Sequence, residues 1–263
     1  MSTSLHVADH HLPTPCEEPG NPRGLLGVLG GMGPLATVDF MHKLLQSTAA
    51  RSDQEHVPVL ISSIPQIPDR TRAFCGEGSS PLSAMVACAL RLKAAGVGLI
   101  VIPCNTAHLW FDDLHERVGV PMLHIVDSAI EGAVEQTAAG ARIGLLATDA
   151  TLASGLYVNR RAAGATSVQW LLPTAQEMLS LVMPGILAVK AGELASGRTL
   201  LLDAARALQK RGAAALVLGC TEIPVVLNDS NSPLPTIDAT AALAKRAAQW
   251  SSTWRCAGRE SAQ

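Results

Sequence analysis

The chain has 263 residues, a net charge of −2, 48% hydrophobic residues and 3% aromatic residues. This length suits two domains of roughly 100–150 residues each. Because there is no basic block and few aromatic side chains that could stack on bases, we expect no nucleic-acid partner. No apolar run reaches the ~20 residues of a membrane span, so we expect no membrane partner either.

The scarcity of aromatic residues means that Ala, Val, Leu and Ile must build the core. Such a core favours helices packed on parallel sheets, which is an α/β fold. Residues 1–23 are polar and lack the apolar segment of a secretion signal, so we interpret them as a disordered N-terminal extension. We expect residues 253–263 to form a tail and the protein to be cytoplasmic.

The first expected strand, 25–29, leads into a glycine-rich loop that matches the dinucleotide-binding pattern G-x-G-x-x-[GA] at 31–36. A nucleotide site of this type also needs an acidic residue at the end of the second strand, expected here at 57–62. Asp53 and Glu55 precede that strand, so we do not expect a nucleotide. The backbone N–H groups of such a loop can still bind a carboxylate.

Two segments, 94–108 and 210–224, repeat one another. Each consists of a helix-ending glycine, an apolar strand, a cysteine and a polar turn. Cys220 follows Cys104 by the same interval that separates the two helix-ending glycines. The repeat extends upstream, because strands are also expected at 143–147 and 167–172 in the second half.

Each half therefore has the order strand, loop, helix, strand, helix, strand and cysteine. This order predicts two pseudo-symmetric α/β lobes, each a parallel sheet flanked by helices, with the active site in the cleft between them. We expect the N-terminal lobe at 24–127, completed by 231–252, and the C-terminal lobe at 128–230. Short fourth strands are expected at 122–126 and 235–238.

None of the six cysteines has a metal-binding spacing, so we expect reduced thiols and no metal site. Cys88 lies within an apolar helical segment and is expected to be a small buried hydrophobic residue. Cys104 and Cys220 instead follow the carboxyl ends of strands, where open α/β sheets bind ligands. Two thiols that face each other across a cleft could move a proton on and off opposite faces of one carbon.

Several motifs resemble those of aspartate racemases within the aspartate/glutamate racemase family. The motifs are GGMGPLAT at 30–37, RSDQEH at 51–56, PQIPDRT at 65–71, PCNTAH at 103–108, LLAT at 145–148, SGLY at 154–157 and GCTE at 219–222. They occur in the family's order and cover roughly residues 24–250. The resemblance implies two α/β lobes, no cofactor and a homodimer.

The resemblance also implies roles for particular residues. Cys104 and Cys220 would be the catalytic thiols, and Arg70 and Lys190 would bind the carboxylates of the substrate. The other residues that the matching motifs place at the substrate are Met32, Asp69, Thr71, Asn105, Thr106, Ala107, Thr148, Thr221 and Glu222.

Removal of an α-proton leaves a carbanion whose charge must spread into the carboxylate, and without a cofactor this requires hydrogen-bond donors. Asn105, Thr106 and Thr221, beside the two cysteines, have suitable side chains for holding the α-carboxylate. One thiol must be ionised while the other stays protonated, and repulsion between two thiolates favours this state. Glu222 and His108 are either structural hydrogen-bonding groups or residues that tune the pKa of the thiols.

The sequence therefore predicts an isomerase that interconverts L- and D-aspartate, with an amino acid as its small-molecule partner and with neither pyridoxal phosphate nor metal. A racemase of glutamate or of broader specificity is one alternative. A decarboxylase or cis–trans isomerase on the same scaffold is another. A non-catalytic, two-lobed amino-acid-binding protein would explain the cleft but not the two matched thiols.

Overall fold

The computed structural model describes residues 22–160 and 168–260, which divide into two compact units. The first lobe contains residues up to Ile125 and from Thr240 onward, and the second contains Val126–Ala239. The return to the first lobe therefore begins at Thr240 rather than at 231, the boundary expected from the sequence. Nearly all of the expected N-terminal extension lies outside the described residues.

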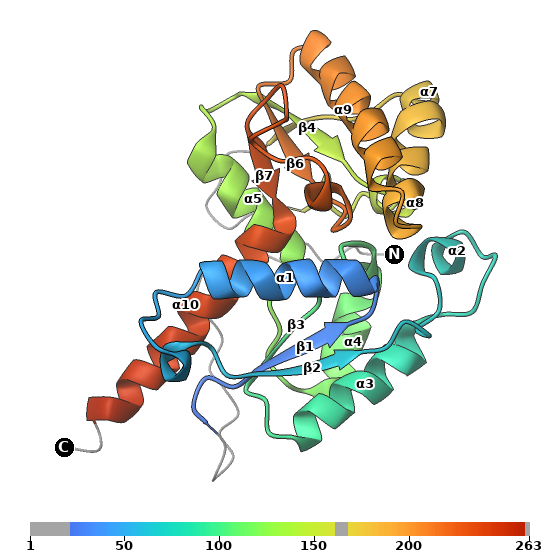
Figure 1. Cartoon of the computed structure of the whole chain (residues 1–263). Coiled ribbons are helices and arrows are strands. Elements are labelled where there is room, and N and C mark those ends of the chain that lie inside the picture. The colour runs from blue at the N-terminus through green and yellow to red at the C-terminus, as the bar shows by residue number, and fades with distance from the viewer. Residues whose placement is uncertain (1–21, 161–167, 261–263) are drawn as a thin grey trace. The chain divides into compact units, whose positions relative to one another are not determined.

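The first lobe is built around a three-stranded parallel sheet with the strand order β2-β1-β3 (Figure 1). Helices α1 and α3 both pack against β1, and Figure 1 shows them on opposite sides of the sheet. The elements are β1 (Leu26–Gly30), α1 (Pro34–Gln46), η1 (Asp53–Glu55), β2 (Val59–Ser63), α2 (Arg70–Phe74), α3 (Leu82–Ala94), β3 (Leu99–Val101), η2 (Thr106–Trp110), α4 (Phe111–Val118) and α10 (Ala239–Glu260).

The second lobe contains a four-stranded parallel sheet with the order β5-β4-β6-β7. Helix α9 packs against both β4 and α8. The elements are α5 (Ile125–Gln136), β4 (Arg142–Leu146), α6 (Asp149–Ala153), β5 (Gln169–Leu171), α7 (Ala175–Glu177), the π-helical turn η3 (Met178–Val182), α8 (Met183–Lys190), α9 (Leu194–Lys210), β6 (Ala215–Leu218), η4 (Ile223–Val225) and β7 (Thr236–Asp238).

The two sheets repeat one arrangement, in which the first strand of each lobe lies between the second and the third. In β1, Gly27 pairs with Leu60 and Ile100, and in β4 the equivalent Gly144 pairs with strands β5 and β6. A Cβ atom on Gly144 would lie 2.6 Å from Leu216 Cδ2, so the side chain of the neighbouring strand fills this space. The α/β fold with parallel sheets and helices, predicted from the sequence repeat, is confirmed.

Some of the predicted helix ends and short strands are present in the structure and others are not. Gly96 and Gly212 follow the ends of α3 and α9 with φ angles of +77° and +89°, as helix-ending glycines do. The expected strand at 235–238 is present as β7. The expected strand at 122–126 is wrong, because only Met122 bridges to β3 and helix α5 already begins at Ile125. Helix α10 also continues through most of the expected C-terminal tail, as far as Glu260.

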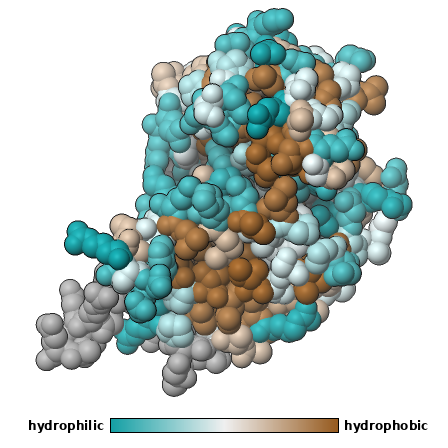
Figure 2. All heavy atoms as spheres, viewed as in Figure 1, coloured by the Kyte–Doolittle hydropathy of each residue, from teal (hydrophilic) through white to brown (hydrophobic). Residues whose placement is uncertain are grey.

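Strand β2 forms an exposed edge of the first lobe. Leu60 is 37% exposed and Ile61 is 46% exposed, although the two side chains point to opposite faces of the sheet. Figure 2 shows hydrophobic side chains gathered below helix α1, where β2 crosses the lobe in Figure 1. On α1 itself, Val38 is 66% exposed.

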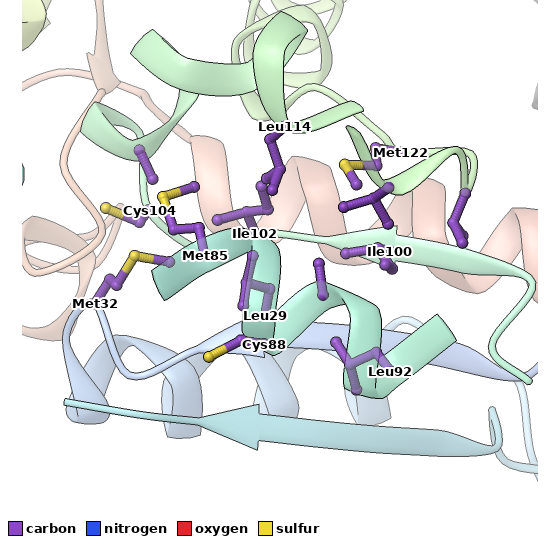
Figure 3. Packing of buried hydrophobic residues seen from close by; sticks show 14 of the residues in the cluster. Leu29, Met32, Met85, Cys88, Leu92, Ile100, Ile102, Cys104, Leu114 and Met122 are labelled. Carbon is purple, nitrogen blue, oxygen red and sulfur yellow. The ribbon is translucent and has the colours of Figure 1, made fainter. Parts of the chain in front are cut away.

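The core of the first lobe lies between the sheet and helices α3 and α4. It contains Leu29 from β1, Cys88 and Leu92 from α3, and Leu114 from α4, all of them buried. Cys88 is 2% exposed, which confirms its expected packing role. Figure 3 shows Met32, Met85 and Cys104 together at one end of this cluster, so the cysteine loop is continuous with the core.

The loop after β1 depends on Gly31, which has a φ angle of +90° and donates its N–H to Thr37 Oγ1 at 2.9 Å. A Cβ atom there would lie 2.4 Å from the backbone nitrogen of Ile64. We predict that Gly31→Ala lowers the free energy of unfolding by about 3 kcal/mol, through backbone strain and overpacking.

Gly76 provides the matched control, because its φ angle is +77° but, apart from its chain neighbours, no atom of the described residues lies within 4 Å of the added Cβ position. Gly76→Ala should cost only about 1 kcal/mol, from the backbone conformation alone. Urea unfolding of both variants measures the difference. Equal losses would contradict the role given to the contact with Ile64.

Candidate active site

Cys104 lies in a tight turn just after β3. Its N–H donates to Ile102 O at 2.8 Å, and Cys104 is only 5% exposed. The 3-10 turn η2 begins two residues later, so the polar residues after the cysteine are held by helical backbone geometry. The sequence prediction of a cysteine at the carboxyl end of this strand is therefore matched by the local structure.

His108 holds the turn around Cys104 in place. Its Nδ1 lies 2.8 Å from Cys104 O, and its Nε2 accepts a hydrogen bond from the N–H of Ile125 at 3.2 Å. Because a carbonyl oxygen only accepts and a backbone N–H only donates, the proton must be on Nδ1. The ring also packs edge-on against His124, with centroids 4.5 Å apart. His108 thus acts as a structural hydrogen-bonding group.

Cys220 takes the equivalent place in the second lobe, two residues after β6 ends. Its residue is also 5% exposed. Its Sγ donates to Glu222 Oε2 at 3.1 Å, and the Thr221 hydroxyl lies 3.4 Å from the same oxygen. The backbone N–H of Ile223 donates to Cys220 O at 3.0 Å and closes the turn.

The surroundings of Cys220 favour the protonated thiol. Burial raises the pKa of this thiol well above its ordinary value, and the Glu222 carboxylate raises the pKa further. The Lys190 ammonium group acts in the opposite direction and lowers the same pKa. Lys190 is an exposed residue at the end of α8, so its charge acts on the thiol from a neighbouring element of the same lobe.

Arg70 is a buried arginine in the first lobe. It is only 8% exposed, although arginine side chains usually lie at the surface. Its Nη1 donates to Ile67 O at 3.1 Å and to Pro68 O at 3.0 Å, and its buried Nε makes no hydrogen bond within the described residues. No carboxylate in the described part of the chain pairs with it. A buried guanidinium group without a counter-ion is suited to bind an anionic ligand.

Asp69, next to this arginine, has a different role. Its Oδ1 accepts a hydrogen bond from the N–H of Arg72 at 2.8 Å, so the carboxylate caps the N-terminus of α2. Thr148 caps α6 in the second lobe in the same way, by accepting from the N–H of Thr151. Both residues therefore shape loops that begin at the carboxyl ends of strands.

The sequence-predicted site residues divide between the lobes. The first lobe holds Met32, Asp69, Arg70, Thr71, Cys104, Asn105, Thr106 and Ala107, and the second holds Thr148, Lys190, Cys220, Thr221 and Glu222. Most of them are buried; Asp69 and Lys190 are exposed, and Thr71 is half-buried. No group of three or more His, Cys, Asp or Glu side chains that could hold a metal ion occurs among the described residues. Likewise, within residues 22–160 and 168–260, no helix is long and apolar enough to cross a membrane.

Sequence reasoning gave no role to Tyr157, the single tyrosine of the chain. This side chain is fully buried and packs edge-on against Trp170, with ring centroids 5.5 Å apart. Burial raises the pKa of its hydroxyl, and the charges of Cys220, Asp238 and Asp127 raise the pKa further. Tyr157 lies in the SGLY motif at 154–157, and this motif is the sequence feature that could have indicated a role for it.

The comparisons with known proteins identify the family. The family model of the Asp/Glu/hydantoin racemases matches residues 29–247. The chain belongs to this family. The solved structure of the Picrophilus torridus aspartate racemase is 30% identical and has a TM-score of 0.76, with 87% of this chain and 94% of that chain covered.

Relatives in this racemase family have different named activities. The broad specificity amino-acid racemase RacX of Bacillus subtilis is 27% identical over 229 residues, which is 84% of this chain and 95% of the relative. A glutamate racemase of Corynebacterium diphtheriae is 33% identical over 175 residues, which is 61% of this chain and 62% of that protein. The resemblance recognised in the sequence is confirmed for the family, and these relatives include racemases of more than one amino acid.

Proposed function

We propose that this protein is a cofactor-independent racemase that interconverts L- and D-aspartate, with Cys104 and Cys220 as the acid and the base. One observation carries this proposal: each of two similarly built lobes places one buried thiol just after its third strand. In this proposal the two lobes present the thiols to opposite faces of the α-carbon. The similarity to the Picrophilus torridus aspartate racemase supports aspartate as the substrate.

In the proposed reaction, one thiolate removes the α-proton and the opposite thiol donates its proton to the other face. The C–H bond of the substrate and the S–H bond of the donor break, and one S–H and one C–H bond form. The negative charge passes into the α-carboxylate, which Asn105, Thr106 and Thr221 would stabilise by donating hydrogen bonds. Neither pyridoxal phosphate nor a metal is needed for these proton transfers.

Recognition of a dicarboxylate follows from the cations. Arg70, which is buried without a counter-ion in the described structure, would bind one carboxylate of aspartate, and Lys190 would supply a second positive charge. The backbone and side chains at Met32, Ala107 and Thr148 would complete the binding surface. Glutamate carries the same groups on a longer side chain, so a glutamate or broad-specificity racemase is the alternative, which the similarity to RacX favours.

We further propose the cytoplasm as the location and a homodimer as the assembly. The cysteines whose pairing is described, Cys75, Cys88, Cys104 and Cys220, are all free thiols, as expected in a reducing compartment. For the dimer we propose antiparallel pairing of β2 with the β2 of a second copy. Within the described residues β2 pairs only with β1, and Val59–Ser63 contains no charged residue that would protect this edge.

The substrate is tested by incubating the wild-type protein in D₂O with single enantiomers of aspartate, glutamate and other amino acids. Loss of the α-proton signal and formation of the opposite enantiomer should be fastest with aspartate, with chelator present and no pyridoxal phosphate added. Exchange with glutamate alone would favour the alternative substrate. If no amino acid exchanges its α-proton, the proposed function is wrong.

We predict that Cys104→Ser and Cys220→Ser each lower turnover by several orders of magnitude, because a serine hydroxyl is a far weaker acid than a thiol. Each variant keeps one thiol, so the two should exchange the α-proton of opposite enantiomers while barely racemising them. Cys88→Ser is the control: it lies in the core and should retain turnover at the cost of some stability. Racemisation near the wild-type rate by either active-site variant would require a one-base mechanism.

For Arg70 we predict a loss of about 30- to 150-fold in kcat/KM with aspartate in Arg70→Lys, equivalent to about 2–3 kcal/mol of transition-state stabilisation. A lysine keeps the charge but offers no parallel pair of donors. Arg72→Lys is the matched control, because Arg72 is exposed in the same helix and should leave the kinetics unchanged. Wild-type kinetics in Arg70→Lys would show that no bidentate contact is made.

For the dimer we predict that Ile61→Asp gives a monomer in equilibrium sedimentation at micromolar concentration. Each copy would bring an aspartate to the centre of the paired strands, so two like charges would oppose each other. Val134→Asp provides the control, since it places the same charge at a residue that is 41% exposed on α5 and is not part of β2. A monomeric wild-type protein, or a dimer in Ile61→Asp, would contradict this interface.

A further inference from the structure

The contact between Cys220 and Glu222 makes the two thiol sites chemically different. Glu222 is 4% exposed, and its Oε2 accepts a hydrogen bond from the Cys220 thiol, with the oxygen 3.1 Å from Sγ. Its Oε1 is buried and makes no hydrogen bond to any residue in the described structure. The carboxylate therefore contacts the thiol and the neighbouring Thr221 hydroxyl, and no cation is paired with it in the described residues.

The backbone enforces this contact. Cys220 and Glu222 are two residues apart in a turn that is closed by the hydrogen bond from Ile223 N–H to Cys220 O, and the 3-10 turn η4 follows at once. Pro224, the second residue of η4, restricts the chain further. The turn therefore holds the backbone of residue 222 near Cys220, and the burial of Glu222, which is 4% exposed, restricts its side chain.

The equivalent turn in the first lobe has no such group. The three residues after Cys104 are Asn105, Thr106 and Ala107, none of which is acidic. The next residue, His108, uses one ring nitrogen on Cys104 O and the other on Ile125 N–H. The two lobes share a fold, but among the residues that the structure describes a carboxylate contacts the thiol in the second lobe alone.

We propose that Glu222 is a positioning residue that keeps the proton on Cys220 in the free enzyme, so that Cys220 rests as the proton donor and Cys104 as the base. This inference rests on the proposed two-thiol function. Glu222 does not touch the substrate in this scheme; it orients the S–H bond and opposes formation of a Cys220 thiolate by charge repulsion. After a turnover in which Cys220 has given up its proton, the same repulsion drives its reprotonation.

The other charged and titratable groups that act on Cys220 are Lys190 on α8 and Tyr157 after α6. Lys190 favours the thiolate, and its effect is smaller than that of Glu222 in raising the pKa of the thiol. The Tyr157 hydroxyl stays neutral, since burial raises its pKa. Glu222 is therefore the group whose removal should change the protonation of Cys220 most.

The test is the rate at which iodoacetamide alkylates Cys220, followed by mass spectrometry of its peptide between pH 6 and pH 10. In Glu222→Gln the amide keeps the shape but removes the charge, and the rate at pH 8 should rise at least about tenfold over the wild type. Glu193→Gln is the matched control, because it removes the same charge from an exposed site in the same lobe. It should leave the alkylation of Cys220 unchanged.

A Cys220 alkylation rate that is equal in the wild type and in folded Glu222→Gln would overturn the proposal. If Glu222→Gln fails to fold, the S–H stretching band of the wild-type protein provides the second measurement. A band shifted to lower frequency, and lost in Cys220→Ser, supports a thiol that donates to a carboxylate, and its absence overturns the proposal. Because neither measurement involves turnover, their failure is distinguishable from a failure of the racemase function, which the exchange of α-protons tests.

Discussion

The pairing of β3 with β1, and of β6 with β4, determines where both thiols lie. Each third strand is fully buried and runs parallel to the first strand of its lobe. Its carboxyl end is therefore fixed beside the carboxyl end of that first strand, where the loops begin. The chain must then turn at once, and hydrogen bonds within the turn hold Cys104 and Cys220 in place. Because parallel sheets bind ligands at the carboxyl ends of their strands, a buried thiol there is in a position to react.

Burial also affects the protonation of Cys220, because it raises the pKa of this thiol. A thiolate loses its hydration in an apolar setting, and this disfavours the charged form unless a cation or hydrogen bonds compensate. Around Cys220 the balance is unfavourable, since Glu222 opposes ionisation more strongly than Lys190 promotes it. The proposed two-thiol reaction needs one thiol and one thiolate, and the Glu222 carboxylate beside Cys220 would keep the proton on that thiol.

Much of this arrangement could be predicted from the sequence because it depends on local patterns. The glycines that end α3 and α9, and the apolar strands that follow, are specified by short-range backbone preferences, and they lead directly to the two cysteines. The segment 122–126 misled the prediction, because its apolar residues pack equally well in the chain that enters α5. Apolar character alone does not distinguish these two structures over so few residues.

Other features of the site depend on contacts that no sequence pattern contains. Glu222 was a candidate to tune a thiol, but only the three-dimensional turn shows that its Oε2 contacts Cys220 while Oε1 is left without a partner in the described residues. Arg70 could equally have been a surface arginine, and only the fold shows that it is buried and that its Nε has no hydrogen-bond partner among the described residues. Tyr157 lies far from Cys220 in sequence, and only the fold shows that the two groups interact.

The central claim is that different thiols remove and deliver the α-proton, and the deuterium content at Cα tests it most directly. Wild-type enzyme would act on L-aspartate in D₂O, and product and unreacted substrate would be separated early in the reaction and analysed by mass spectrometry. The account predicts deuterium in the D-aspartate formed and hydrogen in the remaining L-aspartate, since the donated proton comes from a thiol that has exchanged with solvent. D-aspartate that retains the hydrogen of the substrate would contradict the account, because a single base would then have returned the same proton.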